Sequence, residues 1–149
     1  MANIVPDSFK LDLLTGFQNF NTTSGNTFYL ALYNTVVGFS STGTTAYSTT
    51  ISNAGSTSVE VSGTGYTAGG TTLVISTATV QQDIAFVNFS NATFSTATLS
   101  ASACLIYNTT NSKKAVVVLD FTTTQTATNG SFTIQFPAAN STSAILRIN

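Results

Sequence analysis

The sequence predicts an all-β fold, an antiparallel β-sandwich with one short N-terminal helix, and three observations predict it. From Thr27 onward, β-branched and aromatic residues stand in short runs separated by clusters of Gly, Asn, Ser and Thr. Only one stretch, near the N-terminus, has helical spacing. Because no helices alternate with the strands, a parallel sheet is excluded. The apolar faces must therefore pair as two antiparallel sheets or close into a barrel, and we predict a sandwich, of which the jelly roll is one form.

The predicted helix lies within residues 7–17, DSFKLDLLTGF. Phe9, Leu13 and Leu14 fall on one face at helical spacing, so this face is expected to pack on the sheet. Gly16 can end the helix, because glycine readily adopts the left-handed conformation found at helix ends. The helix is therefore expected to be short.

Two strands show the two burial patterns that the sequence predicts. Residues 27–33, TFYLALY, are apolar on both faces, which indicates a central strand. Residues 131–138, SFTIQFPA, alternate between apolar and polar side chains, which indicates a half-exposed strand that ends at Pro137. Further strands are expected at residues 71–77, 83–89, 93–99, 103–108, 114–121 and 143–149.

Clusters of small polar residues predict the connections between the strands. Residues 110–114 and 128–130 are predicted to be hairpin connections, with Gly130 free to adopt a positive φ. Residues 38–58 contain few apolar side chains, so we predict a long surface segment that holds one edge strand near residues 46–51.

The charge content narrows the partners that this chain can have. Its 149 residues fit a single domain, residues 1–149, yet only 6% of them are charged, against about a quarter in ordinary soluble domains. We infer that neighbouring molecules cover much of the surface. Four basic and five acidic residues, with Lys113 and Lys114 as the one adjacent basic pair, provide no footprint for nucleic acid. No long apolar run indicates a membrane span, and no cofactor motif is present.

The residue types also argue against an enzyme. The chain has no histidine and a single cysteine, Cys104, which we assign to the core because it stands among apolar residues. No metal site is expected. A catalytic carboxylate pair is not expected either, since the carboxylates occupy positions typical of a solvated acid. They are Asp7, Asp12, Glu60, Asp83 and Asp120.

The string SGTGYTAGG, residues 62–70, raises the question of a phosphate-binding loop. Such a loop needs a helix after its glycines, because the N-terminus of the helix supplies the anion site. Here a predicted strand follows instead. We therefore interpret the glycines as permitting unusual φ values and close backbone approach, with Tyr66 as the anchoring side chain.

Several segments together resemble a family of small virion structural proteins of tailed bacteriophages, including marine and cyanobacterial phages. The resemblance covers nearly the whole chain, and SGTGYTAGG, ACLIYN and AVVVLDF are its most specific parts. It implies a capsid decoration, or cement, protein on the exterior of the virion, made in the host bacterial cytoplasm. Its partners would be the major capsid protein and further copies of itself, for example in a trimer.

Two other functions stay open from the sequence. One is a tail, baseplate or fibre component, and the other is a glycan-binding module that the virion displays through tyrosines such as Tyr66. For the decoration protein, we expect the apolar residues Ile4, Val5 and Pro6 of an N-terminal arm, residues 1–6, to reach the capsid. Tyr66 completes the predicted interface.

Overall fold

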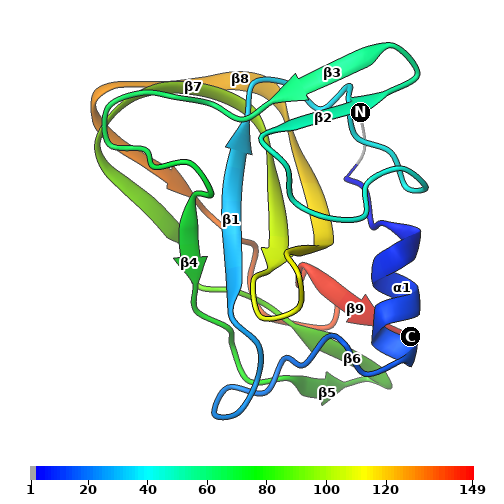
Figure 1. Cartoon of the computed structure of the whole chain (residues 1–149). Helices are drawn as coiled ribbons and strands as arrows, with labels where there is room; N and C mark the ends of the chain where they lie inside the picture. Colours follow the sequence, from blue (N-terminus) through cyan, green and yellow to red (C-terminus); the bar gives the residue numbers. More distant parts are fainter. Residues whose placement is uncertain (1–2) are drawn as a thin grey trace.

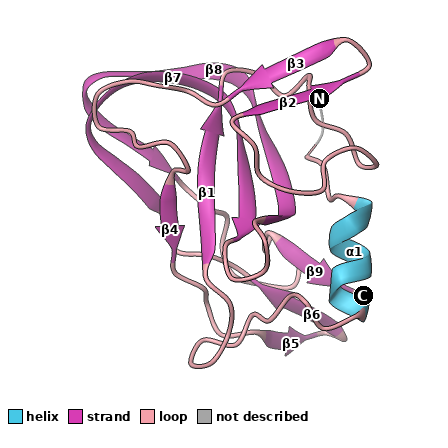
Figure 2. Cartoon of the chain, viewed as in Figure 1, coloured by secondary structure: helices cyan, strands magenta, loops and turns pink. Residues whose placement is uncertain are grey.

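The computed structural model describes residues 3–149 and contains antiparallel sheets with a single short helix (Figure 1 and Figure 2). The predicted all-β fold is therefore confirmed. The main sheet has the strand order β4-β1-β7-β8, a second sheet has the order β5-β6-β9, and β2 pairs with β3. The elements are α1 Asp7–Leu14, β1 Phe28–Tyr33, β2 Thr50–Asn53, β3 Ser56–Val59, β4 Thr71–Leu73, β5 Thr79–Gln81, β6 Ile84–Val87, β7 Ala92–Asn108, β8 Lys114–Ile134 and β9 Leu146–Ile148.

Strands β7 and β8 form one long hairpin that bends over and supplies both layers of the fold (Figure 1). The half nearest the turn pairs with β1, and the outer half returns as a second layer. The bend coincides with shifts in register, where extra residues such as Thr96 and Thr122 have positive φ. Such bulges bend a strand and increase its twist.

This hairpin corrects three of the predictions. Residues 93–99 and 103–108 belong to one strand, as do residues 114–121 and the first part of 131–138. Residues 128–130 are not a hairpin connection, because they lie within β8. Asn129 has the positive φ that a turn would need, but here it forms a bulge opposite β7.

The core lies on both faces of the main sheet. Phe28, Leu30 and Leu32 of β1 point into one cluster, which the outer half of the β7–β8 hairpin closes. Ala31 and Tyr33 point into a second cluster on the opposite face. The prediction that residues 27–33 form a central strand covered on both sides is thus confirmed. Cys104 is fully buried in the first cluster, also as predicted.

Residues 38–58 differ from the predicted surface segment with one edge strand. They include β2 and most of β3, a hairpin whose two turn residues, Ala54 and Gly55, both have positive φ as a type I′ turn requires. Phe39 and Ile51 from this segment are buried in the second cluster. A few apolar side chains therefore suffice to fix a polar segment on the sheet.

Helix α1 is shorter than predicted and presents a different face. It ends at Leu14, after which Gly16 adopts a φ of 75°. Phe9 is buried as predicted, but Leu14 is exposed and Asp12 is buried instead. Among residues 3–149, no helix is long and apolar enough to cross a membrane.

Candidate interaction surface

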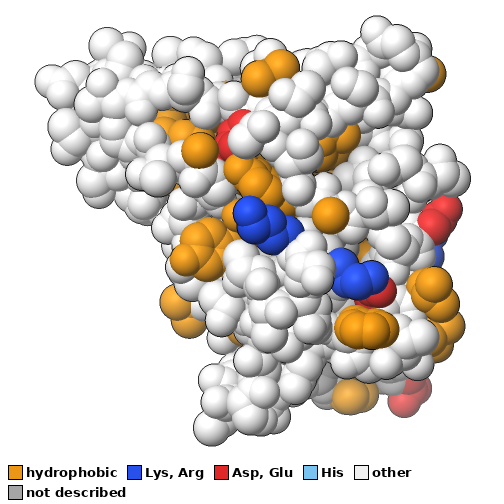
Figure 3. Space-filling view, in the orientation of Figure 1, with side chains coloured by type: hydrophobic (Ala, Val, Ile, Leu, Met, Phe, Trp, Pro, Cys, Tyr) orange, Lys and Arg blue, Asp and Glu red, His pale blue; other side chains and the backbone are white. Residues whose placement is uncertain are grey.

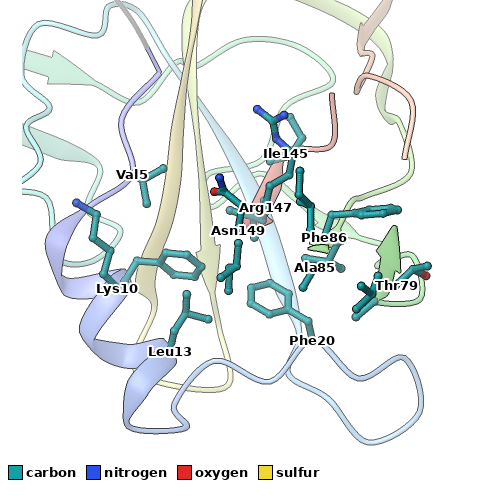
Figure 4. A pocket seen from close by; sticks show the side chains of 17 residues that line it. Val5, Lys10, Leu13, Phe20, Thr79, Ala85, Phe86, Ile145, Arg147 and Asn149 are labelled. Carbon is teal, nitrogen blue, oxygen red and sulfur yellow. The ribbon is translucent and has the colours of Figure 1, made fainter. Parts of the chain in front are cut away.

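An open apolar groove lies between α1 and the sheet β5-β6-β9 (Figure 4). Its volume is about 810 Å³. The helix contributes Phe9 and Leu13 to one wall, and Phe20 follows from the connection to β1. Figure 4 shows Leu13 and Phe20 directed toward the space between the helix and the sheet. A groove of this size can accommodate part of a ligand or of a partner chain.

The pleat of the small sheet explains why the opposite wall is apolar. Side chains alternate between faces, and residues directly opposite in neighbouring strands share a face. Val80 pairs with Ala85, and Ala85 pairs with Ile148, so all three lie on the same face. Val87 and Leu146, two residues along their strands, are buried on this face, whereas Val80 is 68% exposed and Ile148 is 60% exposed. The apolar face thus runs out of the core and into solvent.

Two basic side chains are the charged members of the groove lining. Lys10 lies on α1, where its ammonium contacts the Asp7 carboxylate at 2.8 Å on an exposed surface. Arg147 on β9 donates hydrogen bonds to the backbone carbonyls of Ser141 and Thr142. Because carbonyls are neutral, the charge of Arg147 is not compensated by these bonds. In the register of β9, Arg147 alternates with Ile148, so its side chain lies on the other face of the small sheet from Val80 and Ala85. The groove is therefore mainly apolar.

The predicted N-terminal arm is not free over its described part, residues 3–6. The backbone N–H of Ile4 donates to the carbonyl of Val118, and the N–H of Val118 donates back to Ile4. Pro6 is fully buried at the start of α1. Val5 is 37% exposed and lines the groove, so it is the one predicted arm residue with an accessible side chain at this site. Met1 and Ala2 lie outside the described residues.

Tyr66, the remaining predicted interface residue, belongs to a cluster of all five tyrosines around Glu60. Its hydroxyl donates to Glu60 Oε1 at 2.7 Å and accepts from the backbone N–H of Leu32 at 2.9 Å. Tyr47 donates to Glu60 Oε2 at 2.7 Å. Tyr66 is half-buried against Phe94 of the core. Its contacts therefore join the SGTGYTAGG loop to β1 and to Glu60, the residue that follows β3.

The other buried hydroxyls of the cluster bond to backbone. Tyr33 donates to the carbonyl of Ser48 at 2.6 Å, and Tyr107 donates to that of Gly69 at 2.7 Å. The rings of Tyr47 and Tyr107 are stacked, with centroids 4.6 Å apart. A tyrosine platform for sugars needs free ring faces, so this arrangement serves internal packing better than glycan binding.

Burial changes the acidity of these phenols. Burial raises the pKa of Tyr66 and of Tyr47, and the hydrogen bond of each to Glu60 adds to the effect. For Tyr33, burial again has the largest effect and the negative charge of Glu60 adds to it. Burial, then the charges of Glu60 and Tyr29, raise the pKa of Tyr107 to about 12. These four phenols therefore keep their protons to a higher pH than a free tyrosine does.

The glycines of SGTGYTAGG have the structural role predicted for them. Gly65, Gly69 and Gly70 all have positive φ. A Cβ on Gly63 would lie 2.2 Å from the carbonyl oxygen of Thr98, and one on Gly70 would lie 1.7 Å from that of Leu30. The loop thus approaches the sheet more closely than any residue with a side chain could.

The carboxylates are separated rather than gathered into a site. Asp12 was predicted to be solvated, but it is buried and accepts from Lys114 Nζ at 2.7 Å and from Gln18 Nε2 at 3.4 Å. Asp83 is exposed in the turn between β5 and β6. Within residues 3–149, no group of three or more His, Cys, Asp or Glu side chains is placed to hold a metal ion.

Sequence reasoning missed the groove. Its signal was present in Val80 and Ile148, apolar residues of short segments near polar neighbours, but their shared face depends on pairing between β5, β6 and β9.

Comparison of the chain with models of protein families, with curated proteins and with solved structures gives no match.

Proposed function

We propose that this chain is a structural protein of a tailed-bacteriophage virion, a capsid decoration or cement protein that binds at junctions between major capsid protein subunits. The family resemblance of its sequence supplies the direction. The observation that carries the proposal is that α1 exposes Leu11 and Leu14, although it buries Phe9 and the charged Asp12. A helix of a free monomer normally turns its apolar side chains to the core.

The rest of the surface supports a role in assembly. Blue and red atoms occupy small isolated areas of the face in Figure 3, and orange atoms lie over the position of α1 at the right of the view. Leu11 and Leu14 lie on the helix whose other side borders the apolar groove. Contiguous exposed apolar surface is typical of sites that bind other proteins. The low charge content leaves little else to keep free copies apart.

The partners follow from this role. The major capsid protein covers the apolar surface, and copies of this chain associate with one another, for example as a trimer, on the exterior of the capsid. The arm contributes through Val5, while Ile4 and Pro6 fix it to the domain. Tyr66 bonds to Glu60 and Leu32 within the domain, so we do not propose it as a direct contact.

Quantitative mass spectrometry of purified particles tests the proposal. A decoration protein is expected in copy numbers comparable to those of the major capsid protein. A few copies per particle would instead indicate the tail, baseplate or fibre alternative, and absence from mature particles would refute a virion role altogether.

A variant tests whether the copy number per particle depends on the exposed side chains of α1. Leu11→Gln with Leu14→Gln removes the exposed apolar side chains from α1 without touching its buried residues. We expect an unchanged fold by circular dichroism and a reduced copy number on the particle. Val37→Gln is the matched control, because Val37 is also exposed but lies between β1 and β2. Full occupancy by the helix variant would contradict the proposal.

A further inference from the structure

We propose that two copies of this chain pair through the free edges of their β5 strands, in antiparallel register about a two-fold axis at Val80. Two small sheets of three strands each then form one sheet of six strands, with both apolar faces on the same side. This inference rests on the proposed function for its setting, the assembled particle. It makes a pair of copies, in place of a trimer, the unit of self-association.

The backbone of β5 is arranged to accept another strand. Gln82 and Asp83 both have positive φ and form the two-residue turn between β5 and β6, with Gln81 opposite Ile84. In a hairpin of this kind the residues that flank the turn bond to each other, and the next pair directs its N–H and C=O groups away from the partner strand. Val80 belongs to that next pair. Its N–H and C=O therefore point to the outer edge of the sheet.

This edge has none of the features that usually keep edge strands apart. Residues 77–82, TATVQQ, are all exposed and contain neither a charged residue nor a proline. Within residues 3–149, no backbone group outside the small sheet bonds to Val80. Monomeric proteins commonly protect such an edge with lysine, proline, a bulge or a covering segment. The edge of β5 is therefore open to a further strand.

Both faces of β5 match those of a second copy. Residues directly opposite each other in an antiparallel pair share a face, and here Val80 lies opposite Val80 of the second copy. On this face the apolar row of Ile148, Ala85 and Val80 continues into the same row of the other copy. On the other face Thr79 lies opposite Gln81, and both side chains are polar and uncharged. The register therefore places apolar beside apolar and polar beside polar side chains.

The charges of two copies are compatible with this register. No charge lies on β5 itself, and Asp83 stands in the turn that follows it. The two Asp83 residues would lie at opposite ends of the paired strands, roughly 20 Å apart at about 3.3 Å per residue. This distance exceeds the Debye length of about 8 Å at physiological ionic strength, so their repulsion is screened. With a net charge of −1 on each chain, the copies meet little electrostatic opposition.

A second copy is the occupant that these features favour. A strand from another protein would need the same alternation of apolar and uncharged polar residues, together with a free edge of its own. The second copy has both by symmetry, because the N–H of each Val80 meets the C=O of the other. A fatty acid could lie against the apolar face, but it has no N–H or C=O groups that pair with a strand edge.

Pairing also enlarges the apolar surface that a particle could cover. Val80 and Ile148 line the groove, and the grooves of two copies would open on the same side of the joined sheet. Figure 4 shows α1 on the side of the groove opposite Thr79 of β5. The two helices would therefore flank one continuous apolar surface, centred on the paired strands.

Disulfide trapping tests the register. Position 80 is the one position of β5 that lies opposite itself, at a Cα separation of about 5.5 Å, so Val80→Cys should form a disulfide-linked dimer in oxidised glutathione. Thr79→Cys is the matched control, because position 79 lies diagonal to its own copy, about 7–8 Å away, and should crosslink poorly. Cys104 is fully buried and does not compete. Equal crosslinking at both positions would overturn the proposed pairing.

Sedimentation equilibrium measures the association itself. Val80→Lys places two ammonium groups opposite each other, so we expect the dissociation constant of the dimer to rise by at least about tenfold. Val74→Lys should leave it unchanged, because Val74 is 66% exposed but does not line the groove. An equimolar mixture of Val80→Lys and Val80→Asp should restore dimers, since opposite charges then face each other. Circular dichroism verifies the fold of each variant.

The outcomes separate this inference from the proposed function. A wild-type chain that stays monomeric at about 1 mM overturns the pairing. Growth into longer polymers overturns it as well, because a two-fold contact closes at two copies. A chain that pairs through position 80 but is absent from mature particles keeps the pairing and refutes the virion role. Abundant protein on particles without crosslinking at position 80 does the reverse.

Discussion

Replacing Gly70 by Ala should destabilise the protein far more than the same change at Gly55, although both glycines have nearly the same positive φ. Their φ values are 78° and 81°. A Cβ on Gly55 would meet nothing within 4 Å. A Cβ on Gly70 would lie 1.7 Å from the carbonyl oxygen of Leu30 and 2.9 Å from the Cα of Ala31. The pair therefore separates the cost of the backbone conformation from the cost of close contact.

The magnitudes follow from these contacts. At Gly55 the cost is that of a left-handed conformation for a residue with a side chain, about 1–2 kcal/mol. At Gly70 the same cost applies, and displacement of the loop from β1 adds about 1–3 kcal/mol for overpacking. The displaced loop also strains the bonds from Gly69 N–H to Glu60 and from Tyr107 to the carbonyl of Gly69, each worth about 1 kcal/mol. We expect a total of about 3–5 kcal/mol at Gly70.

Equilibrium unfolding in urea measures both variants, with the midpoint and the slope compared to the wild type. Gly70→Ala should shift the midpoint at least about twice as far as Gly55→Ala. Equal shifts would refute the view that SGTGYTAGG is fixed on β1 by close backbone approach. The loop would then have to be regarded as free to bind something else.

Three further results are expected. Tyr66→Phe removes the hydroxyl that bonds to both Glu60 and the N–H of Leu32, and it should lower the free energy of unfolding in urea by about 1–3 kcal/mol. An unchanged free energy would contradict a structural role for the tyrosine cluster. The pKa of Tyr107 is raised to about 12, so its contribution to stability is fully present below the unfolded pKa, about 10, and is lost as pH rises between the two values. Phenolate absorbance of the folded protein should accordingly lag behind that of the urea-unfolded chain, and coincident titrations would exclude the burial of these phenols. Asp12→Asn removes the charged partner of Lys114 and should lower the free energy of unfolding by about 1–2 kcal/mol, less than for a fully buried pair because Lys114 keeps contact with water. Thermal unfolding measures this loss. Asp7→Asn, which breaks an exposed pair, should have little effect.

Local pattern predicted the fold class and the central strand, because apolar side chains on both faces of residues 27–33 indicate directly that both faces are covered. It did not predict that β7 and β8 are single bent strands, since a bulge such as that at Asn129 uses the same residue types as a turn. Whether Asn-Gly turns the chain or only bends it depends on the pairing of strands distant in sequence. The burial of Asp12 on α1 escaped prediction for a similar reason, because its partner Lys114 begins β8, far away in the sequence.

The candidate site, too, could be predicted from the sequence only in part. The N-terminal arm was predicted to be an interface because its residues are apolar. Only the fold reveals that Ile4 pairs with Val118 and that Pro6 is buried, while Val5 borders the groove. The groove itself was not foreseen, because neither Val80 nor Ile148 is notable until the strands pair.

The two sides of the molecule differ in how their chemistry is used, and this difference supports the placing of the contact surface. Around Glu60, phenolic hydroxyls and a backbone N–H already bond to the carboxylate, so a partner binding there would have to break existing bonds. Around the groove, Val80 and Ile148 are exposed to water, so a partner would bury apolar surface at little cost. Association is favoured where desolvation releases water from apolar surface without unpairing polar groups. Binding of a partner is therefore favoured on the groove side, whereas the hydrogen bonds on the tyrosine side keep the fold rigid.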